Sequence, residues 1–191
     1  MNAFLLASYH LNKETQEKTG SLQELVISDA NKIECSPHSQ EFPYGILSLK
    51  QEEDLDLFSM GCSDGLIRLI RHHPRDQELT AEVRVYGRGD EASKNVCLMH
   101  DSSEILIAGC YQDGSVTVFD KETGGVLCDQ PKLHQYEAWY THLSDTTLYS
   151  CSDDCSFKAL DTRSNSLIFT CKKHDAGVTW LSTLHHFDAP E

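Results

Sequence analysis

One short motif occurs three times in this chain and constrains the fold more than any other feature. The copies, which align without gaps, are Phe58–Ile70, Ile107–Phe119 and Leu148–Leu160. Each copy has two strand-like runs joined by a tight turn that contains an aspartate. The turns are Asp64-Gly65, Asp113-Gly114 and Asp154-Cys155. Because glycine adopts positive φ without a Cβ clash, Asp-Gly between two such runs is a strong hairpin signal. The motif therefore predicts three copies of one β-hairpin.

A further strand is expected on each side of every hairpin. Leu49, Leu98 and Trp139 each precede the start of a hairpin by nine residues. Candidate fourth strands follow at residues 79–86, 125–128 and 167–171. The unit recurs after 49 residues (Ile70 to Phe119) and again after 41 (Phe119 to Leu160). Four short strands per repeat are typical of the blades of a β-propeller, so the sequence predicts an all-β fold.

The repeats predict one incomplete propeller domain of about three and a half four-stranded blades. Complete blades are expected at residues 44–86, 94–130 and 137–171, after a partial, degenerate first blade at 1–35. Residues 172–191 are expected to begin a further blade, with Gly177–Leu181 as its first strand. Since a closed propeller needs at least four blades, we expect a truncated fragment. Its unpaired sheet edges would favour aggregation.

The charge balance narrows the range of partners. The chain has 30 acidic and 16 basic residues, for a net charge of −14. Such a chain repels phosphate backbones and attracts cationic ligands, so nucleic acid is not an expected partner. The apolar run at residues 3–7 lacks the basic residues of a signal peptide. No apolar run approaches the roughly 18 residues of a membrane helix. We therefore expect a cytoplasmic protein that does not contact membranes.

The eight cysteines do not predict a disulfide framework or a metal site. Cys151 and Cys155 are spaced as a C-x3-C pair, but no second pair of ligands follows at the spacing of a zinc site. The other six stand singly in apolar or strand-like segments, where a thiol packs as a small hydrophobic side chain. No metal and no cofactor are predicted.

The third hairpin resembles a WD repeat. Leu160-Asp161-Thr162-Arg163 stands where that family has its Trp-Asp signature. His134 and His174 precede expected inner strands, where the family has Gly-His. The signature tryptophan is replaced in the three repeats by Ile70, Phe119 and Leu160. We therefore expect the His–Ser/Thr–Asp–Trp hydrogen-bond network of the family to be incomplete in every blade.

Residues 134–181 also resemble a narrower family, the diphthine methyl ester hydrolases of diphthamide biosynthesis. The similar segments are His134–Trp139, Leu148–Asp154, Asp161–Arg163, Phe169–His174 and Gly177-Val178. The resemblance implies an enzyme that hydrolyses the methyl ester of methylated diphthine on translation elongation factor 2. A non-catalytic WD-repeat scaffold for protein–protein interaction and an inactive truncation product are the alternatives.

Ester hydrolysis needs a base, a nucleophile and donors for the oxyanion. No G-x-S-x-G nucleophile motif is present. In a WD propeller, the loop before an inner strand and the hairpin turn share a face, which predicts His134, Glu137 and His174 as catalytic candidates. His134 could act as a general base oriented by Glu137 or by a neighbouring aspartate, or it could tie the turn to the strands of its own blade. Glu137 replaces Leu47 and Val96 of the other repeats, so its carboxylate should reach a partner or water.

Four aromatic residues are expected to cluster near the same strand openings: Tyr136, Trp139, Tyr140 and Trp180. Of these, Tyr136, Trp139 and Trp180 are the candidates for binding the substrate. Aromatic faces attract quaternary ammonium groups, and diphthine carries a trimethylammonium group. The alternative is that these rings only pack one blade against the next.

Overall fold

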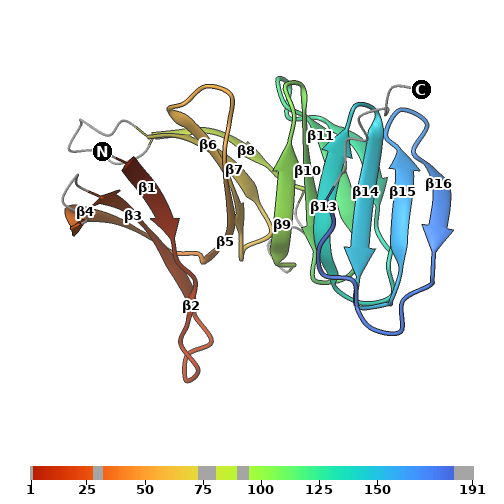
Figure 1. Cartoon of the computed structure of the whole chain (residues 1–191), viewed down its shortest axis with the longest axis horizontal. Coiled ribbons are helices and arrows are strands. Elements are labelled where there is room, and N and C mark those ends of the chain that lie inside the picture. The colour runs from red at the N-terminus through yellow and green to blue at the C-terminus, as the bar shows by residue number, and fades with distance from the viewer. Residues whose placement is uncertain (1, 28–31, 73–80, 90–94, 183–191) are drawn as a thin grey trace, which may run out of the picture.

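The computed structural model describes residues 2–27, 32–72, 81–89 and 95–182, and within these ranges it contains strands and turns but no helix (Figure 1). Its strands form four antiparallel sheets of four strands each. Three of the sheets are regular meanders in which consecutive strands pair. They consist of β5 (Ile46–Gln51), β6 (Leu57–Cys62), β7 (Ile67–Arg71) and β8 (Ala81–Tyr86); β9 (Cys97–Ser102), β10 (Leu106–Tyr111), β11 (Val116–Asp120) and β12 (Val126–Gln130); and β13 (Ala138–Ser144), β14 (Thr147–Ser152), β15 (Phe157–Asp161) and β16 (Ser166–Cys171).

Each regular sheet has the form of a propeller blade, which confirms the predicted all-β propeller architecture. The pairs Gly61–Ile67, Cys110–Val116 and Cys151–Phe157 occupy equivalent positions in the three hairpins. In every turn the aspartate accepts a hydrogen bond from the backbone N–H two residues later, at 2.9 to 3.3 Å. The next residue has positive φ: 82° for Gly65, 81° for Gly114 and 59° for Cys155. The repeated motif thus forms one turn geometry three times, even where cysteine replaces glycine.

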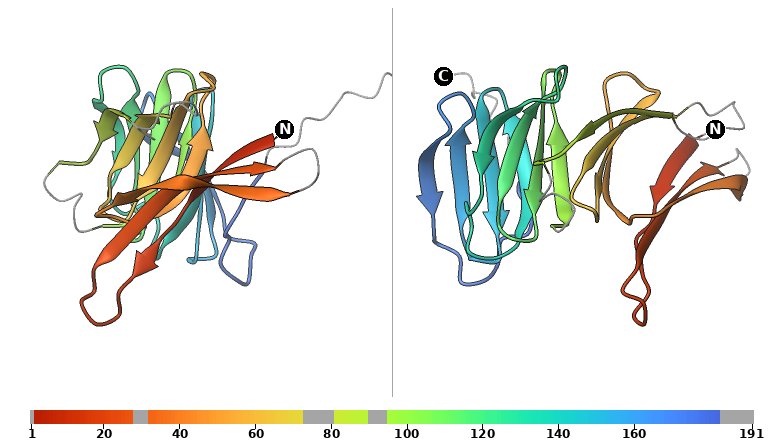
Figure 2. Two further views of the ribbon diagram at one scale, coloured as in Figure 1. Left: turned by 90° about the vertical axis from the view of Figure 1, so that its left-hand side faces the viewer. Right: turned by 180° about the vertical axis from the view of Figure 1, so that it is seen from behind.

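The three regular sheets pack face to face in chain order, as Figure 2 shows. Between the first and second of them lies an apolar core that includes Ile67, Tyr86 and Phe119. Between the second and third lies another core that includes Val118, Cys128 and Leu148. Strands β5, β9 and β13 are the first strands of their sheets, and β9 lies beside both β5 and β13. This arrangement brings residues of three sheets together along the first strands.

The N-terminal sheet is larger than predicted. It consists of β1 (Asn2–Ala7), β2 (His10–Leu11), β3 (Lys18–Ile27) and β4 (Ile33–Phe42), with β3 pairing to all the others. The partial blade predicted at 1–35 omitted most of β4. This run mixes polar residues with Pro37, so it lacks the apolar alternation from which strands were assigned. Backbone pairing to β3 forms the strand without that pattern.

The strand predicted at Gly177–Leu181 is wrong. Residues 172–182 have no strand structure. This segment contacts the third regular sheet, where the Val178 N–H donates a hydrogen bond to the Ser152 carbonyl at 2.9 Å. A strand requires a ladder of such bonds, and no described strand pairs with Gly177–Leu181. The remainder of the blade predicted at 172–191 lies outside the described residues.

Candidate functional site

His134 lies in the loop before β13 and is bonded within its own blade. Its Nδ1 lies 3.1 Å from Asp154 Oδ2 and 3.2 Å from Ser156 Oγ. Its Nε2 lies 3.1 Å from Ser150 Oγ, and the side chain has no exposed surface. The histidine, serine and aspartate of a WD-type network are therefore present, with Leu160 at the tryptophan position.

Electrostatics in this cluster favour a neutral imidazole beside a carboxylate. Burial lowers the pKa of His134, and Asp154 offsets part of that effect. Burial raises the pKa of Asp154, but hydrogen bonds from Ser156, the Gln135 N–H and His134 outweigh it and bring this pKa to about 2. With both ring nitrogens engaged, His134 ties the hairpin turn to its own sheet. This geometry supports the structural role, and the catalytic role of His134 stays a prediction.

The other two catalytic candidates are not connected to His134. Glu137 is half-buried directly before β13, and its carbonyl accepts a hydrogen bond from the Asp153 N–H at 3.2 Å. His174 is exposed in the segment after β16. Within residues 95–182, no hydrogen bond or ion pair links His134, Glu137 and His174 to one another. Their catalytic roles stay predictions.

Of the three aromatic candidates, Trp180 has the most defined environment. Its ring packs edge-on against Tyr140 of β13, with centroids 5.9 Å apart and planes at 66°. Trp180 is 63% exposed, Tyr136 is 59% exposed and Trp139 is 37% exposed. The Tyr140–Trp180 pair therefore presents aromatic surface to solvent on the face of the β13–β16 sheet.

The same face carries a row of rings. His142 of β13 stacks on Tyr149 of β14, Tyr149 on Phe157 of β15, and Phe157 contacts Phe169 of β16. Centroid separations are 6.5, 5.8 and 5.4 Å. In the other regular sheets the corresponding face is covered by the next sheet along the chain.

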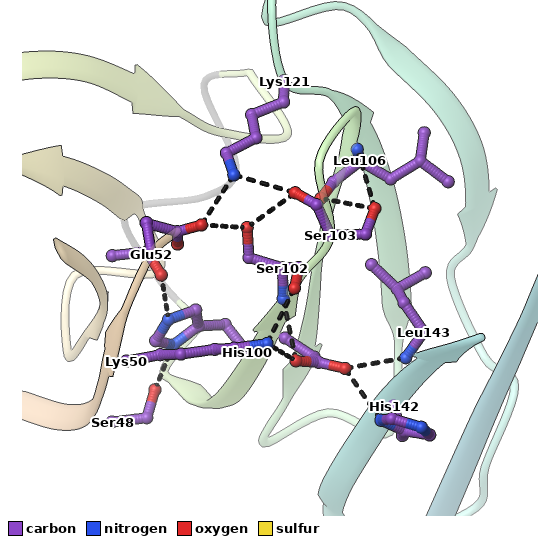
Figure 3. A network of polar contacts seen from close by, with 12 residues as sticks. Ser48, Lys50, Glu52, His100, Ser102, Ser103, Leu106, Lys121, His142 and Leu143 are labelled. Carbon is purple, nitrogen blue, oxygen red and sulfur yellow. Dashed lines mark hydrogen bonds and ion pairs between the residues drawn. The ribbon is translucent and has the colours of Figure 1, made fainter. Parts of the chain in front are cut away.

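A histidine–carboxylate pair that sequence reasoning missed lies between the first strands (Figure 3). His142 Nδ1 lies 2.9 Å from Oδ2 of Asp101, a residue of β9. The same Asp101 oxygen accepts a hydrogen bond from the Leu143 N–H at 2.8 Å. Lys50 of β5 pairs with the other Asp101 oxygen and also donates to the Ser102 carbonyl at 2.7 Å. Three sheets thus contribute to one polar cluster.

Asp101 is an anionic and rigidly held acceptor. Its side chain is 12% exposed. Burial raises the pKa of Asp101, but hydrogen bonds from Lys50, the Leu143 N–H and the Ser102 N–H outweigh this effect and lower the pKa below its usual value. The His142 side chain is 29% exposed. Within the described ranges, its Nε2 has no hydrogen-bond partner.

One sequence signal could have identified this pair. Asp101 and His142 are 41 residues apart, which is also the spacing of the second and third repeats. Residues at equivalent positions in successive first strands of a propeller are neighbours around the axis. Neither Asp101 nor His142 belongs to a recognisable motif, so only the alignment of the second and third repeats would have identified them as a pair.

Two hollows lie away from the predicted residues. One, of about 480 Å³, is lined in part by Arg88, Tyr111 and Asp129. The other, of about 550 Å³, is strongly acidic. Its charged lining consists of Glu52, Glu53, Asp54, Glu104, Asp120, Glu122 and Lys121. Glu52 belongs to the cluster of Figure 3, because its Oε2 accepts hydrogen bonds from Ser102 at 2.8 Å and Lys121 at 2.6 Å.

Other site types find no counterpart in the part of the chain that the structure describes. No helix there is long and apolar enough to cross a membrane. No cluster of three or more His, Cys, Asp or Glu side chains there could hold a metal ion. All eight cysteines are free thiols, five of them buried. The predictions on metal, cofactor, nucleic acid and localisation stay predictions.

Comparison with known proteins confirms the fold and gives one lead to function. No protein-family model matches the chain. It is 28% identical over 193 residues to a protein of Schizosaccharomyces pombe named diphthine methyltransferase, covering 93% of this chain. The chain spans about half (54%) of that relative's length.

Solved structures similar to this chain include WD40 β-propellers. The WD40 domain of Toxoplasma gondii coronin matches with a TM-score of 0.69 and 14% identity, over 93% of this chain and 52% of that one. The WD40 propeller domain of Doa1 matches with a TM-score of 0.65 and 13% identity, over 88% and 55%. At such identities the likeness establishes the WD-repeat propeller fold alone.

Proposed function

We propose that this chain acts in diphthamide biosynthesis, in the cytoplasm, by hydrolysing the methyl ester of methylated diphthine on translation elongation factor 2. The observation that carries the proposal is the match to the S. pombe protein, which extends over 93% of this chain. A match confined to one hairpin would be expected of any WD-repeat protein. A match over almost the whole chain adds support to the family resemblance that the similar segments within residues 134–181 suggest.

The structure adds chemistry that suits this substrate. Methylated diphthine has a trimethylammonium group next to its ester. The pair of half-buried Tyr140 and exposed Trp180 offers aromatic faces that attract such a cation. The net charge of −14 favours the approach of cationic groups in general.

Intact-peptide mass spectrometry tests this function. Purified chain is incubated with elongation factor 2 bearing methylated diphthine, and the mass of the modified peptide is measured. Hydrolysis removes CH2 overall, so we expect a loss of about 14 Da together with release of methanol. The name of the S. pombe relative refers instead to methyl transfer. Transfer of a methyl group onto unmethylated diphthine would give a gain of about 14 Da and needs a methyl donor, so it is assayed with one. No mass loss from the methylated substrate would refute the hydrolase proposal.

A WD-repeat scaffold is the second candidate function. The observation in its favour is His134, which the structure ties to its own hairpin through Asp154, Ser156 and Ser150. The WD40 fold itself suggests protein–protein interaction. A scaffold would bind elongation factor 2 or another protein without changing the mass of the peptide, so the same experiment with an added pull-down separates the two candidates.

A further inference from the structure

We propose that His142, oriented by Asp101, is the general base that activates water for this ester hydrolysis, and that Tyr140 and Trp180 hold the adjacent trimethylammonium group. This inference rests on the proposed function. It assigns the base to a residue outside the three candidates that the sequence indicated.

His142 has two properties that His134 lacks: part of its side chain is exposed, and within the described residues its Nε2 is not hydrogen-bonded. It exposes 29% of its side chain, whereas the His134 side chain is fully buried. Its Nδ1 is bonded to Asp101 at 2.9 Å, and within the described residues its Nε2 has no partner. A carboxylate on Nδ1 holds the ring in the tautomer whose Nε2 carries the lone pair, and it stabilises the imidazolium that forms during proton transfer.

Asp101 is a positioning residue whose own orientation is fixed from three sheets. It accepts from the Leu143 N–H at 2.8 Å and from the Ser102 N–H at 2.9 Å, and Lys50 pairs with it. Stacking on Tyr149, at 6.5 Å and 19°, restricts the His142 ring from its other side. The imidazole is therefore held before any substrate binds, as a general base requires.

The position of the aromatic pair fits the shape of the substrate. Tyr140 and His142 are two residues apart on β13 and point to the same face, with the buried Thr141 between them pointing to the other. Side chains two residues apart along a strand are separated by about 7 Å. In the substrate a single carbon links the ammonium nitrogen to the ester carbonyl. A cation held against Tyr140 and Trp180 thus places the ester close to His142.

The reaction balances without a cofactor. His142 Nε2 accepts a proton from water while the water oxygen bonds to the ester carbonyl carbon. The tetrahedral intermediate then collapses, the bond from carbon to the methoxy oxygen breaks, and the imidazolium returns the proton to the leaving methoxy oxygen. The products are methanol and the acid, which ionises to the carboxylate.

The test compares variants of the whole chain in the mass assay. His142→Gln should lower kcat by about 100-fold or more, the usual contribution of a general base, with little change in KM. Asp101→Asn should lower kcat by about tenfold with KM retained, because the ring keeps a hydrogen-bond partner but loses the carboxylate. His10→Gln, in the exposed β2, is the matched control and should keep wild-type activity.

Chemical rescue separates catalysis from folding. In His142→Ala, added imidazole should restore a substantial part of kcat, which a merely structural role for His142 would not produce. Circular dichroism of each variant checks that the sheets remain. An active wild type whose His142→Gln retains kcat within about threefold, or a loss in His142→Ala that imidazole does not rescue, would overturn this assignment alone. An inactive wild type would overturn it together with the proposed function.

Discussion

At the scale of single residues, the hairpin turns define where substitutions are tolerated. Gly114 has φ +81°, and a Cβ atom there would lie 2.5 Å from the His134 carbonyl oxygen and 2.6 Å from that of Tyr136. Gly89 has a similar φ of +85°, but nothing lies within 4 Å of its Cβ position. The two glycines therefore separate the cost of backbone conformation from the cost of crowding.

We predict that Gly114→Ala lowers the free energy of unfolding by about 3 kcal/mol, because backbone strain and overpacking add. Gly89→Ala should cost only about 1 kcal/mol, from conformation alone. Urea denaturation measures both values. Equal effects would mean that the contact between the second turn and the loop of His134 contributes nothing.

Buried histidines predict how stability depends on pH. His100 is 4% exposed and bonded to Ser48 and Ser59. Burial lowers the pKa of His100 to about 4. An unfolded histidine titrates near 6.5, so as the pH falls the unfolded chain binds this proton first. The stability that neutral His100 provides is complete above about pH 6.5 and is lost as the pH falls toward 4.

The free energy of unfolding should therefore decrease by about 3 kcal/mol from this group between pH 7 and pH 4. The lowered pKa of His134 adds to the decrease in the same direction. His100→Gln should flatten the profile, and His10→Gln, at an exposed position of β2, is the matched control. Parallel profiles for wild type and His100→Gln would contradict the account of His100.

At the scale of elements, the hairpins were predictable and the ends of the chain were not. The Asp-containing turn is a local signal, so three hairpins could be read from their own residues. Strand β4 forms by pairing with β3, and its sequence carries no alternation. Gly177–Leu181 has strand-like residues, yet no described strand pairs with it. Pairing between His142 and Asp101 likewise depends on the packing of β9 beside β13, which no local pattern contains.

The edge strand β16 predicts self-association. Among the described strands it pairs only with β15, and it exposes Leu167 (52%), Ile168 (54%) and Phe169 (41%). Exposed apolar edges of this kind pair with other chains, and a charged side chain on the edge opposes that pairing. We expect sedimentation velocity to show association that increases with concentration.

Ile168→Lys should shift the sedimentation profile toward monomer. Leu55→Lys is the matched control, since Leu55 is 73% exposed in a loop and lies on no strand. Wild-type chain that stays monomeric at all concentrations would contradict the prediction, as would equal effects of the two lysine substitutions.

At the scale of the whole molecule, the arrangement of the sheets creates the candidate site. The polar cluster draws Lys50, Asp101 and His142 from three consecutive sheets, so no single blade contains it. The acidic hollow reaches the same cluster through Glu52 and Ser102. The chain spans about half the length of the S. pombe relative, and the proposed base His142, its carboxylate Asp101 and the Tyr140–Trp180 pair all lie within residues 101–180.

Hydrolysis in water labelled with oxygen-18 tests the central claim most directly, because it reports both the product and the atom attacked. If water adds to the ester carbonyl, the carboxylate keeps one heavy oxygen. The peptide should then lose about 12 Da in labelled water and about 14 Da in ordinary water. An unchanged mass would contradict the account, and so would a loss that is the same in both solvents.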